Sequence, residues 1–222
     1  MTERCGVPPT IQTITVGPLA VNCYLVGDPD TMQAFILDPG AEPEQILAAA
    51  SGGGWTVTSI LVTHAHFDHV LGVQGLVETT GAPFLMHPDG VKLLERAPEV
   101  TQRWLGIDFP APPQPDGFIS EGDTVEAGGF TFRVVDTPGH SPGGICLIGE
   151  GEAFVGDTLF EGSIGRTDLP GADYDVLMTS IFEKLLPLDD DTVLYPGHGP
   201  ATTVGVERKT NPFILQLSNG II

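Results

Sequence analysis

Short apolar segments separated by turn-forming residues open the chain. Residues 11–16, 21–26 and 34–37 are rich in apolar and β-branched side chains, and the sequences "GP", "GDPDT" and "DPG" follow them. β-Branched residues favour extended backbone, and short clusters of Gly, Pro and Asp mark tight turns. This pattern predicts three strands in an antiparallel meander.

Farther along the chain, the apolar pattern changes between a strand period and a helix period. Short apolar runs predict strands at residues 58–63, 83–86, 124–127, 130–135, 145–148, 153–155 and 192–195. Apolar positions three and four residues apart predict helices at residues 42–50, 70–79, 90–96, 174–186 and 204–209, with a further helical turn or two after Pro98 up to Leu105. Asp89 is expected to cap the helix at 90–96. The buried side of the helix at 174–186 is expected to carry Val176, Leu177, Ile181 and Leu185.

A proline-rich stretch interrupts this alternation. Between Gly106 and Gly117 the sequence "IDFPAPPQPD" contains four prolines. Proline prevents a regular helix and favours a stiff, extended backbone. The stretch is expected either to brace the surface as a strut or to cover a substrate site as a lid.

The order of these elements indicates an α/β fold with two sheets. Two sets of strands alternate with helices, and the sequence has no glycine signature of a dinucleotide-binding or phosphate-binding turn. Two β-sheets packed face to face, with helices outside, satisfy this order. We expect one domain over residues 1–222, because no repeat or linker divides the chain.

Charge excludes several classes of partner. The 222 residues include 9 Lys and Arg against 29 Asp and Glu, which gives a formal net charge of −20. Such a chain repels the phosphates of nucleic acid and the anionic surface of a membrane. The amino terminus has no basic segment followed by an apolar stretch, and no apolar run reaches the length that spans a bilayer, so we expect a cytoplasmic protein. The pattern makes no prediction of an oligomeric state.

The three cysteines carry no metal or disulfide signal. Cys5, Cys23 and Cys146 are an odd and widely spaced set without a C-x-x-C pair. Such spacing favours neither a disulfide framework nor a thiolate zinc site. They are expected to be small apolar residues of the core or part of a frayed terminus.

Five of the six histidines and two aspartates fall in loops that follow predicted strands. The motifs are "THAHFDH" at 63–69, "TPGH" at 137–140, "VGDT" at 155–158 and "YPGHG" at 195–199. Loops at strand ends hold polar side chains on a rigid scaffold, and imidazole and carboxylate groups bind metal ions. His64 and His66 are two residues apart, so in an extended segment both point to one side and can bind one ion. Asp68 and His69 follow where the chain turns, and can face a second ion. The remaining histidine, His87, is expected to cap a turn or to pack in the core.

The complete set of motifs resembles the metallo-β-lactamase superfamily. The family signature H-x-H-x-D-H matches His64, His66, Asp68 and His69, and the later ligand motifs match His140, Asp157 and His198. The resemblance covers about residues 11–205, which it implies to be the core. It implies a four-layer αββα sandwich of two mixed β-sheets, with two divalent metal ions at one end. With only 22 residues after Pro200, we expect no separate helical domain at the carboxyl end. It implies that the first ion is held by His64, His66 and His140, the second by Asp68, His69 and His198, and that Asp157 bridges the two.

The resemblance also implies a supporting group and a choice of metals. Asp38 in "LDPG" matches an acidic position behind the ligands, which orients them through hydrogen bonds. The alternative role of Asp38 is to form the turn before Pro39. The ligand types suit zinc, which we expect, as well as iron or manganese.

Within the superfamily, the chain is similar to a short glyoxalase II-like branch. Residues 156–177, "GDTLFEGSIGRTDLPGADYDVL", look like that branch, and "GRTD" also occurs in the related persulfide dioxygenases. Secreted β-lactamases lack the aspartate found here as Asp157, so antibiotic hydrolysis is not expected. The resemblance implies a metal-dependent hydrolase of thioesters such as S-lactoylglutathione, in which Asp68 orients a metal-bridging hydroxide.

Other roles stay open at this point. One alternative is a mononuclear iron persulfide dioxygenase that uses His64, His140 and Asp157, and another is a non-catalytic, metal-stabilised binding protein. Arg166 is expected either to bind a substrate carboxylate or carbonyl or to pair with Asp168. In "ERKTNPF" at 207–213, Arg208 and Lys209 are expected to meet a substrate carboxylate or the carboxyl end of a helix.

Overall fold

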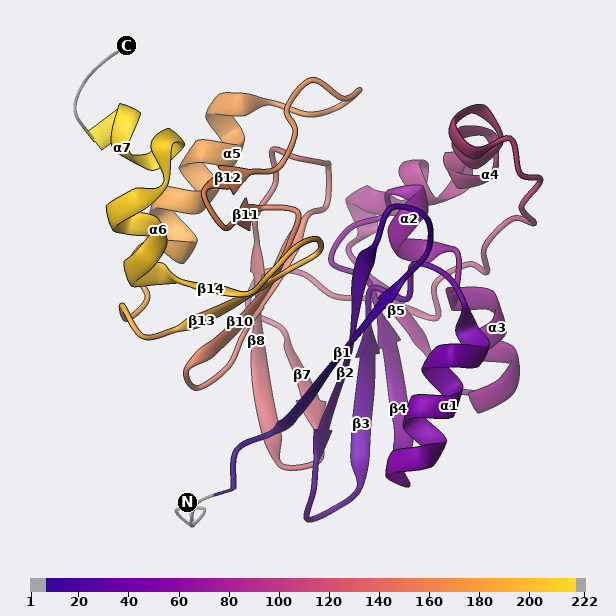
Figure 1. The fold of residues 1–222 in the computed structure, drawn as a ribbon. Coiled ribbons are helices and arrows are strands. Elements are labelled where there is room, and N and C mark those ends of the chain that lie inside the picture. The colour runs from indigo at the N-terminus through magenta and orange to yellow at the C-terminus, as the bar shows by residue number, and fades with distance from the viewer. Residues whose placement is uncertain (1–6, 219–222) are drawn as a thin grey trace.

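A computed structural model of the chain describes residues 7–218 and shows two six-stranded sheets packed face to face (Figure 1). The first sheet has the order β1-β2-β3-β4-β5-β6. Its strands are β1 (Thr10–Val16), β2 (Val21–Asp28), β3 (Gln33–Leu37), β4 (Thr56–Leu61), β5 (Phe84–Met86) and β6 (Gly117–Phe118). Strands β1 to β3 form the predicted antiparallel meander, and β3 to β6 are parallel.

The second sheet has the order β14-β13-β10-β9-β8-β7. Its strands are β7 (Thr124–Ala127), β8 (Phe130–Asp136), β9 (Ile145–Ile148), β10 (Glu152–Gly156), β13 (Val193–Pro196) and β14 (Thr202–Thr203). β10 and β13 are parallel, and the other neighbours are antiparallel. A separate hairpin joins β11 (Leu159–Phe160) to β12 (Ser163–Ile164). Both large sheets are therefore mixed, as predicted.

Helices cover the outer face of each sheet (Figure 1). The first sheet is covered by α1 (Pro43–Gly53), α2 (Phe67–Val70), α3 (Val73–Thr80), the 3₁₀ turn η1 (Pro88–Gly90) and α4 (Val91–Leu105). The second is covered by α5 (Tyr174–Ser180), η2 (Ile181–Leu185), α6 (Val204–Thr210) and α7 (Pro212–Ser218). The predicted αββα sandwich is confirmed. Within residues 7–218, no helix is both long and apolar enough to cross a membrane.

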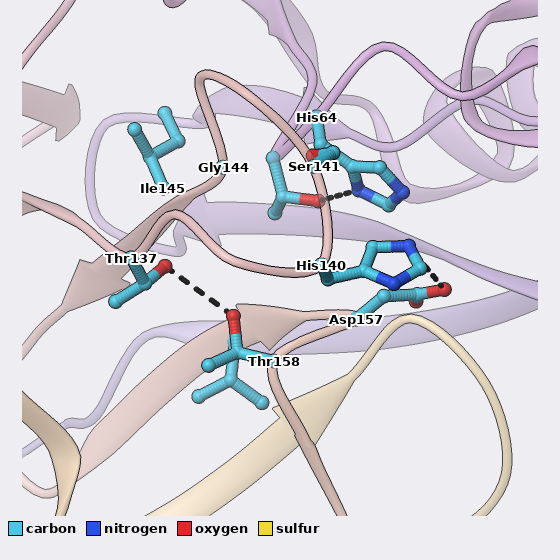
Figure 2. Close-up of a pocket in the computed structure, with 10 residues that line it drawn as sticks. His64, Thr137, His140, Ser141, Gly144, Ile145, Asp157 and Thr158 are labelled. Atoms are coloured by element: carbon cyan, nitrogen blue, oxygen red, sulfur yellow. Dashed lines mark hydrogen bonds and ion pairs between the residues drawn. The ribbon is translucent and has the colours of Figure 1, made fainter. Parts of the chain in front are cut away.

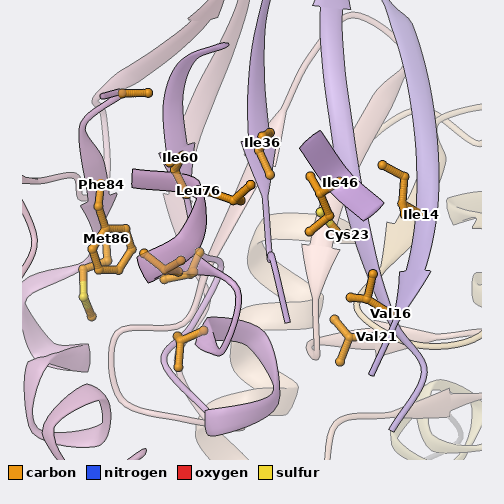
Figure 3. Packing of buried hydrophobic residues seen from close by; sticks show 14 of the residues in the cluster. Ile14, Val16, Val21, Cys23, Ile36, Ile46, Ile60, Leu76, Phe84 and Met86 are labelled. Atoms are coloured by element: carbon orange, nitrogen blue, oxygen red, sulfur yellow. The ribbon is translucent and has the colours of Figure 1, made fainter. Parts of the chain in front are cut away.

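Strands buried on both faces divide the core into layers. Cys23 of β2 and Ile36 of β3 face the outer helices (Figure 3), whereas their neighbours Tyr24 and Phe35 face the second sheet. The period of two along a strand explains why successive apolar side chains enter different layers. Between the sheets, the rings of Phe35 and Phe132 meet edge to face with centroids 5.4 Å apart. This packing fixes the strand ends from which the polar loops project.

The helix predicted at residues 70–79 begins three residues later, as α3, and the separate short helix α2 precedes it. α2 ends at Val70, α3 begins at Val73, and the chain turns at Leu71 and Gly72. The amide of Gly72 donates to the carbonyl of Pro39 at 2.7 Å, outside any helix. A Cβ at Gly72 would lie 2.7 Å from the same oxygen, so glycine permits this close approach. The break separates the short helix that carries Asp68 and His69 from the longer covering helix.

The segment around Pro98 also differs from the prediction. α4 continues through Pro98 as one helix, because Leu94, Ala97 and Thr101 bury one continuous face against the core. The expected cap, Asp89, is not the acceptor at the start of this region. His87 Nδ1 accepts from the amide of Asp89 at 3.1 Å, which agrees with the capping role expected for His87.

Other boundaries shift more modestly. After α5 the chain widens into the π-helical turn η2, in which the amide of Leu186 donates to the carbonyl of Ile181. Leu177, Ile181 and Leu185 are buried as predicted, but Val176 is 40% exposed. The core extends past the expected limit of 205, because Ile214 of α7 is buried in the second helical layer.

The proline-rich stretch is attached to neighbouring elements near both of its ends. Asp116 accepts from the amide of Phe84 at 2.9 Å and donates its own amide to the Phe84 carbonyl at 2.8 Å. Gln102 of α4 donates to Asp108 at 2.8 Å. These contacts fit the strut that the sequence allowed.

The cysteines within the described residues lie in the core. Cys23 and Cys146 are fully buried with free thiols, as expected for small apolar residues. Cys5 lies outside the described residues.

Candidate metal centre

Four loops that follow strands bring seven polar side chains together at one end of the sandwich. The loop after β4 carries His64 and His66 and leads into α2 with Asp68 and His69. The loops after β8, β10 and β13 carry His140, Asp157 and His198. Strand ends of the two sheets thus converge on one point, which is what the spacing of the motifs predicts.

The first group of potential ligands is His64, His66 and His140. One ring nitrogen of each lies within 4.8 Å of the others. His66 Nδ1 is 2.9 Å from His140 Nε2. Figure 2 shows His64 and His140 on adjacent loops, with their rings turned toward the same space. Three imidazole nitrogens so placed can bind one divalent ion.

The second group is Asp68, His69 and His198. Asp68 Oδ2 lies 3.3 Å from His198 Nε2 and 3.8 Å from His69 Nε2. Asp157 lies between the two groups. Its Oδ1 is 3.5 Å from His69 Nε2, and its Oδ2 is 3.6 Å from both His140 Nε2 and His198 Nε2. One carboxylate therefore faces both groups, which is the arrangement that a bridging ligand requires.

The outward nitrogen of several histidines is held by a neighbour, which leaves the inward nitrogen free. Nδ1 of His140 donates to the carbonyl of Arg166 at 2.9 Å, and Nδ1 of His198 donates to the carbonyl of Leu19 at 3.0 Å. Nδ1 of His64 lies 3.2 Å from Thr63 Oγ1. This hydroxyl itself donates to Asp38, so we assign the proton to His64 Nδ1. In all three rings Nε2 keeps its lone pair for an ion.

Asp38 supports the cluster from behind. It is fully buried, and it accepts from the amide and the hydroxyl of Thr63 at 2.6 and 2.7 Å. Its Oδ2 also lies 3.2 Å from His69 Nδ1. Its φ of 52° is a left-handed value that Asp tolerates better than most side chains. Asp38 therefore forms the turn before Pro39 and also contacts His69, so its two expected roles coexist.

Buried polar atoms without a partner test whether metal ions fit. His64 Nε2, His69 Nε2 and Asp157 Oδ1 are buried and lack a hydrogen-bond partner. Burying such atoms unsatisfied is costly, and all three point into the cluster. Imidazole and carboxylate donors suit zinc, iron or manganese. The residues thus fit a pair of divalent ions.

The surroundings set the protonation of the ligands in different directions. Burial lowers the pKa of His64 well below its ordinary value, and burial together with His140 lowers the pKa of His66 to about 3. Burial opposes protonation of His69 too, but the carboxylates of Asp38, Asp157 and Asp68 outweigh it and raise its pKa to about 10. Burial would raise the pKa of Asp68, yet the imidazoles of His69 and His198 hold it below its usual range. Such divergent shifts in one cluster are typical of functional sites.

A small cavity lies directly behind the cluster (Figure 2). Its lining includes His64, His140 and Asp157 together with the hydroxyl-bearing Thr137, Ser141 and Thr158. Thr158 Oγ1 donates to Thr137 Oγ1 at 3.3 Å. Hydroxyl groups from the loops after β8 and β10 therefore line part of this cavity, beside the apolar Ile145 and Val155.

Arg166 has two roles at the rim. Its carbonyl orients His140, while its guanidinium donates to both carboxylate oxygens of Asp168 at 2.9 and 2.8 Å. The guanidinium also lies 6.0 Å from the ring centre of Trp104. The pairing with Asp168 that the sequence allowed is thus formed, and the side chain is about half exposed beside the metal cluster.

Arg208 and Lys209 lie in the last turn of α6, at the carboxyl end of a helix, which is one of the two places that the sequence allowed. Both pair with Asp190, and Arg208 also donates to the carbonyl of Leu188 at 3.1 Å, so neither reaches the cluster. Trp104, 56% exposed at the end of α4, was not expected at the rim. A large aromatic residue in the polar sequence "TQRWLG" was the available signal. The carbonyls of Leu19 and Arg166 left no signal, because every residue has a carbonyl.

Two six-stranded sheets with outer helices, and a bipartite His/Asp cluster at the strand ends, define an αββα metalloprotein. The family model of the metallo-β-lactamase superfamily matches residues 16–198, and the chain belongs to this superfamily.

Similarity to known proteins extends over nearly the whole chain. Hydroxyacylglutathione hydrolase GloC of Haemophilus influenzae is 39% identical over 92% of this chain and 97% of its own length. The crystal structure of the BLEG-1 B3 metallo-β-lactamase superposes with a TM-score of 0.86 at 38% identity, covering 92% of this chain and 99% of that one. A di-iron-bound structure of TTHA1623 gives 0.83 at 43% identity, with 91% and 99% covered. Relatives with both hydrolase names and a di-iron centre thus share this fold.

Proposed function

We propose that the protein is a glyoxalase II-like thioester hydrolase that acts on S-lactoylglutathione or a related hydroxyacyl thioester. The observation that carries the proposal is the placement of Asp157 between two ligand groups, with its oxygens 3.5 to 3.6 Å from His69, His140 and His198. Similarity to GloC over 92% of the chain supports the substrate class. A small molecule is the proposed partner, because a net charge of −20 disfavours nucleic acid and membrane surfaces.

The ligand sets give each side chain a role. His64, His66 and His140 would hold one ion, Asp68, His69 and His198 the other, and Asp157 both; we expect zinc, with iron or manganese as alternatives. Such a pair, when bound, supplies Lewis acidity that lowers the pKa of a water and polarises the thioester carbonyl. Asp68 accepts a hydrogen bond from the attacking oxygen and so fixes its direction. His140 and His198 keep their orientation through the carbonyls of Arg166 and Leu19.

The rim offers contacts for the rest of the substrate. A small recess beside Asp68 is lined by Leu19, Phe67, Leu71 and Leu105, all apolar. Arg166 presents a cation next to the exposed ring of Trp104. This ring lies beside Phe67 of the recess, with the ring centroids 6.5 Å apart. We assign the recess to an apolar part of the acyl group and Arg166 to a carboxylate of the thiol.

One experiment tests the activity and the metal together. Protein expressed without metal bias is analysed for metal content and assayed for cleavage of S-lactoylglutathione, for oxygen uptake on glutathione persulfide and for hydrolysis of a β-lactam. About two ions per chain with thioester cleavage are expected. One iron per chain with oxygen uptake would replace the proposal by a persulfide dioxygenase. Metal without turnover in any assay would indicate a metal-stabilised binding protein.

A second candidate, β-lactam hydrolysis, is favoured by the similarity to BLEG-1. The same preparation distinguishes it, because a β-lactam contains an amide and releases no thiol. Thiol release is detected with a disulfide reagent, whereas β-lactam opening is followed by ultraviolet absorbance. A β-lactam rate above the thioester rate would reverse the order of the two candidates.

A further inference from the structure

The motif "ERKTNPF" contains two residues, Glu207 and Asn211, that have no part in the proposed catalysis. Both are fully buried at the junction of α6 and the β11–β12 hairpin. Glu207 accepts three hydrogen bonds, from the amide of Gly162 at 2.9 Å, from Thr202 Oγ1 at 2.6 Å and from Asn211 Nδ2 at 2.9 Å. All three donors are uncharged groups. Burying a carboxylate costs free energy, which these three hydrogen bonds offset only while their donors stay in place.

Asn211 holds the same hairpin from a second side. Its Nδ2 donates to the carbonyl of Ser163 at 3.0 Å and, at 3.5 Å, to that of Phe160. Glu207 binds the turn at Gly162, whose φ is 65° and whose amide donates to the Glu207 carboxylate. Backbone groups of Phe160, Gly162 and Ser163 at the tip are thus held by Glu207 of α6 and by Asn211, which follows this helix.

The hairpin in turn contacts three of the seven potential ligands. Asp157 lies immediately before it, and the ring of Phe160 is 6.4 Å from that of His198. Where the chain returns at Gly165, a Cβ would collide with the carbonyl of Asp157 and lie 3.0 Å from His140 Cβ. The next residue, Arg166, provides the carbonyl that orients His140. A shift of the hairpin tip would therefore reach the bridging aspartate and both late histidines.

We propose that Glu207 and Asn211 are positioning residues, which act through the β11–β12 hairpin to hold Asp157, His140 and His198 in metal-binding geometry. The inference rests on the metal centre but not on the thioester substrate. It assigns the segment 207–213 to support of the metal centre, in place of the substrate contact considered for Arg208 and Lys209. Outer hydrogen-bond partners of this kind change metal affinity by about 10- to 100-fold when removed.

The test replaces Glu207 by Gln and compares this variant with a second variant, Asp190→Asn. The Gln side chain keeps the shape of Glu207 but turns one acceptor into a donor that faces other donors. Asp190 pairs with Arg208 and Lys209 of the same helix, away from the hairpin, so its variant is a matched control for loosening α6. Hydrogen exchange of residues 157–166 is measured in the metal-free protein, and Co²⁺ affinity is measured by absorption titration. Melting temperature is recorded for every variant.

E207Q is expected to speed exchange in residues 157–166 and to weaken Co²⁺ binding by about 10- to 100-fold, whereas D190N keeps parent values in both. If hydrogen exchange in residues 157–166 and Co²⁺ affinity are the same in E207Q as in the parent protein, the inference is overturned, whatever the melting temperature. If E207Q does not fold, Thr202→Val removes a single hydrogen bond to Glu207 and should shift both readouts in the same direction by less. Unchanged readouts in T202V would then overturn it. Neither readout needs a substrate. The inference can therefore hold even if the protein does not hydrolyse thioesters, and the two results are distinguished.

Discussion

Asp38 Oδ2 lies 3.2 Å from His69 Nδ1, and both side chains are buried. Burial disfavours a charged imidazole, but the carboxylates around His69 outweigh it and raise its pKa to about 10 in the metal-free protein. His64 and His66, by contrast, have lowered pKa values because burial prevails there. One member of the cluster therefore holds a proton at neutral pH, and metal binding must displace it.

Replacing Asp38 by Asn is expected to change the proton balance of metal binding. Asn tolerates the left-handed φ of 52° at this position, so the turn is kept while the charge beside His69 is removed. At pH 8 the parent should release about one proton more per chain than D38N when Zn²⁺ binds. Calorimetry in buffers of different ionisation enthalpy measures this difference. Equal proton release in the two proteins would contradict the raised pKa of His69.

The same pair has a consequence for the stability of the metal-free protein. The pKa of His69 is raised in the folded state, so its contribution is complete below its ordinary value of 6.5 and is lost as pH rises toward about 10. We expect the melting temperature of the metal-free parent to fall between pH 7 and pH 10 more steeply than that of D38N. Parallel curves for the two proteins over this range would show that Asp38 does not stabilise the charged ring.

Asp157→Asn tests the proposed bridge. The amide keeps the size of the side chain but lacks the charge that brings two cations together. Metal content is expected to fall from about two ions per chain to less than one, with turnover lost. Elemental analysis after gel filtration measures this, and a circular dichroism spectrum checks the fold. Two retained ions with normal turnover would reject the bridging role.

Gly197 lies so close to the cluster that a methyl group has no space there. A Cβ at this position would collide with Asp157 Oδ1 and lie 2.8 Å from His69 Cε1. Gly197→Ala should therefore weaken Zn²⁺ binding by at least about 10-fold. Gly52→Ala in α1 is the matched control, because no atom lies within 4 Å of its Cβ, and alanine should stabilise that helix by about 0.5–1 kcal/mol. Competition with a chromogenic chelator compares the two variants; equal affinities would argue against the tight fit.

The sequence predicted that seven His and Asp side chains converge, because they are side chains in motifs with a distinctive spacing. His64, His66 and His69 lie within one loop and helix start, and the later motifs each follow an apolar strand. Strand period also located the two sheets, because successive residues such as Cys23 and Tyr24 are buried on alternate faces. These features depend on the spacing of residues that are close in the chain, and this spacing can be read from the sequence.

Other features depend on contacts between distant segments. The helix break at Gly72 follows from a hydrogen bond to Pro39, and α4 continues through Pro98 because tertiary packing outweighs local preference. The carbonyls that orient His140 and His198 are backbone groups without a residue signature. Glu207 reads as an ordinary acidic residue of a surface helix until the β11–β12 hairpin is seen to cover it. The supporting groups of the site were therefore harder to predict than its ligands.

The core thiols are expected to be unreactive in the folded protein. Cys23 and Cys146 are fully buried, and burial raises the pKa of Cys146 to about 12 and that of Cys23 well above its ordinary value. In a Cys5→Ser background, a disulfide reagent should label neither thiol in buffer and both in guanidinium chloride. Rapid labelling in buffer would mean that the first or second sheet opens more readily than its packing implies.

Arg166 and Asp168 form an exposed pair, which contributes little to stability and can open for a substrate. If the guanidinium binds a carboxylate of the thiol, Arg166→Ala should raise KM for S-lactoylglutathione by about 10-fold, with kcat nearly unchanged. The carbonyl that orients His140 belongs to the backbone and survives this substitution. A neutral thioester of N-acetylcysteamine, which lacks a carboxylate, should show the same KM in parent and variant. Arg103→Ala, an exposed cation of α4, controls for the loss of one positive charge. An equal rise in KM for both substrates would assign Arg166 to the shape of the site rather than to recognition of charge.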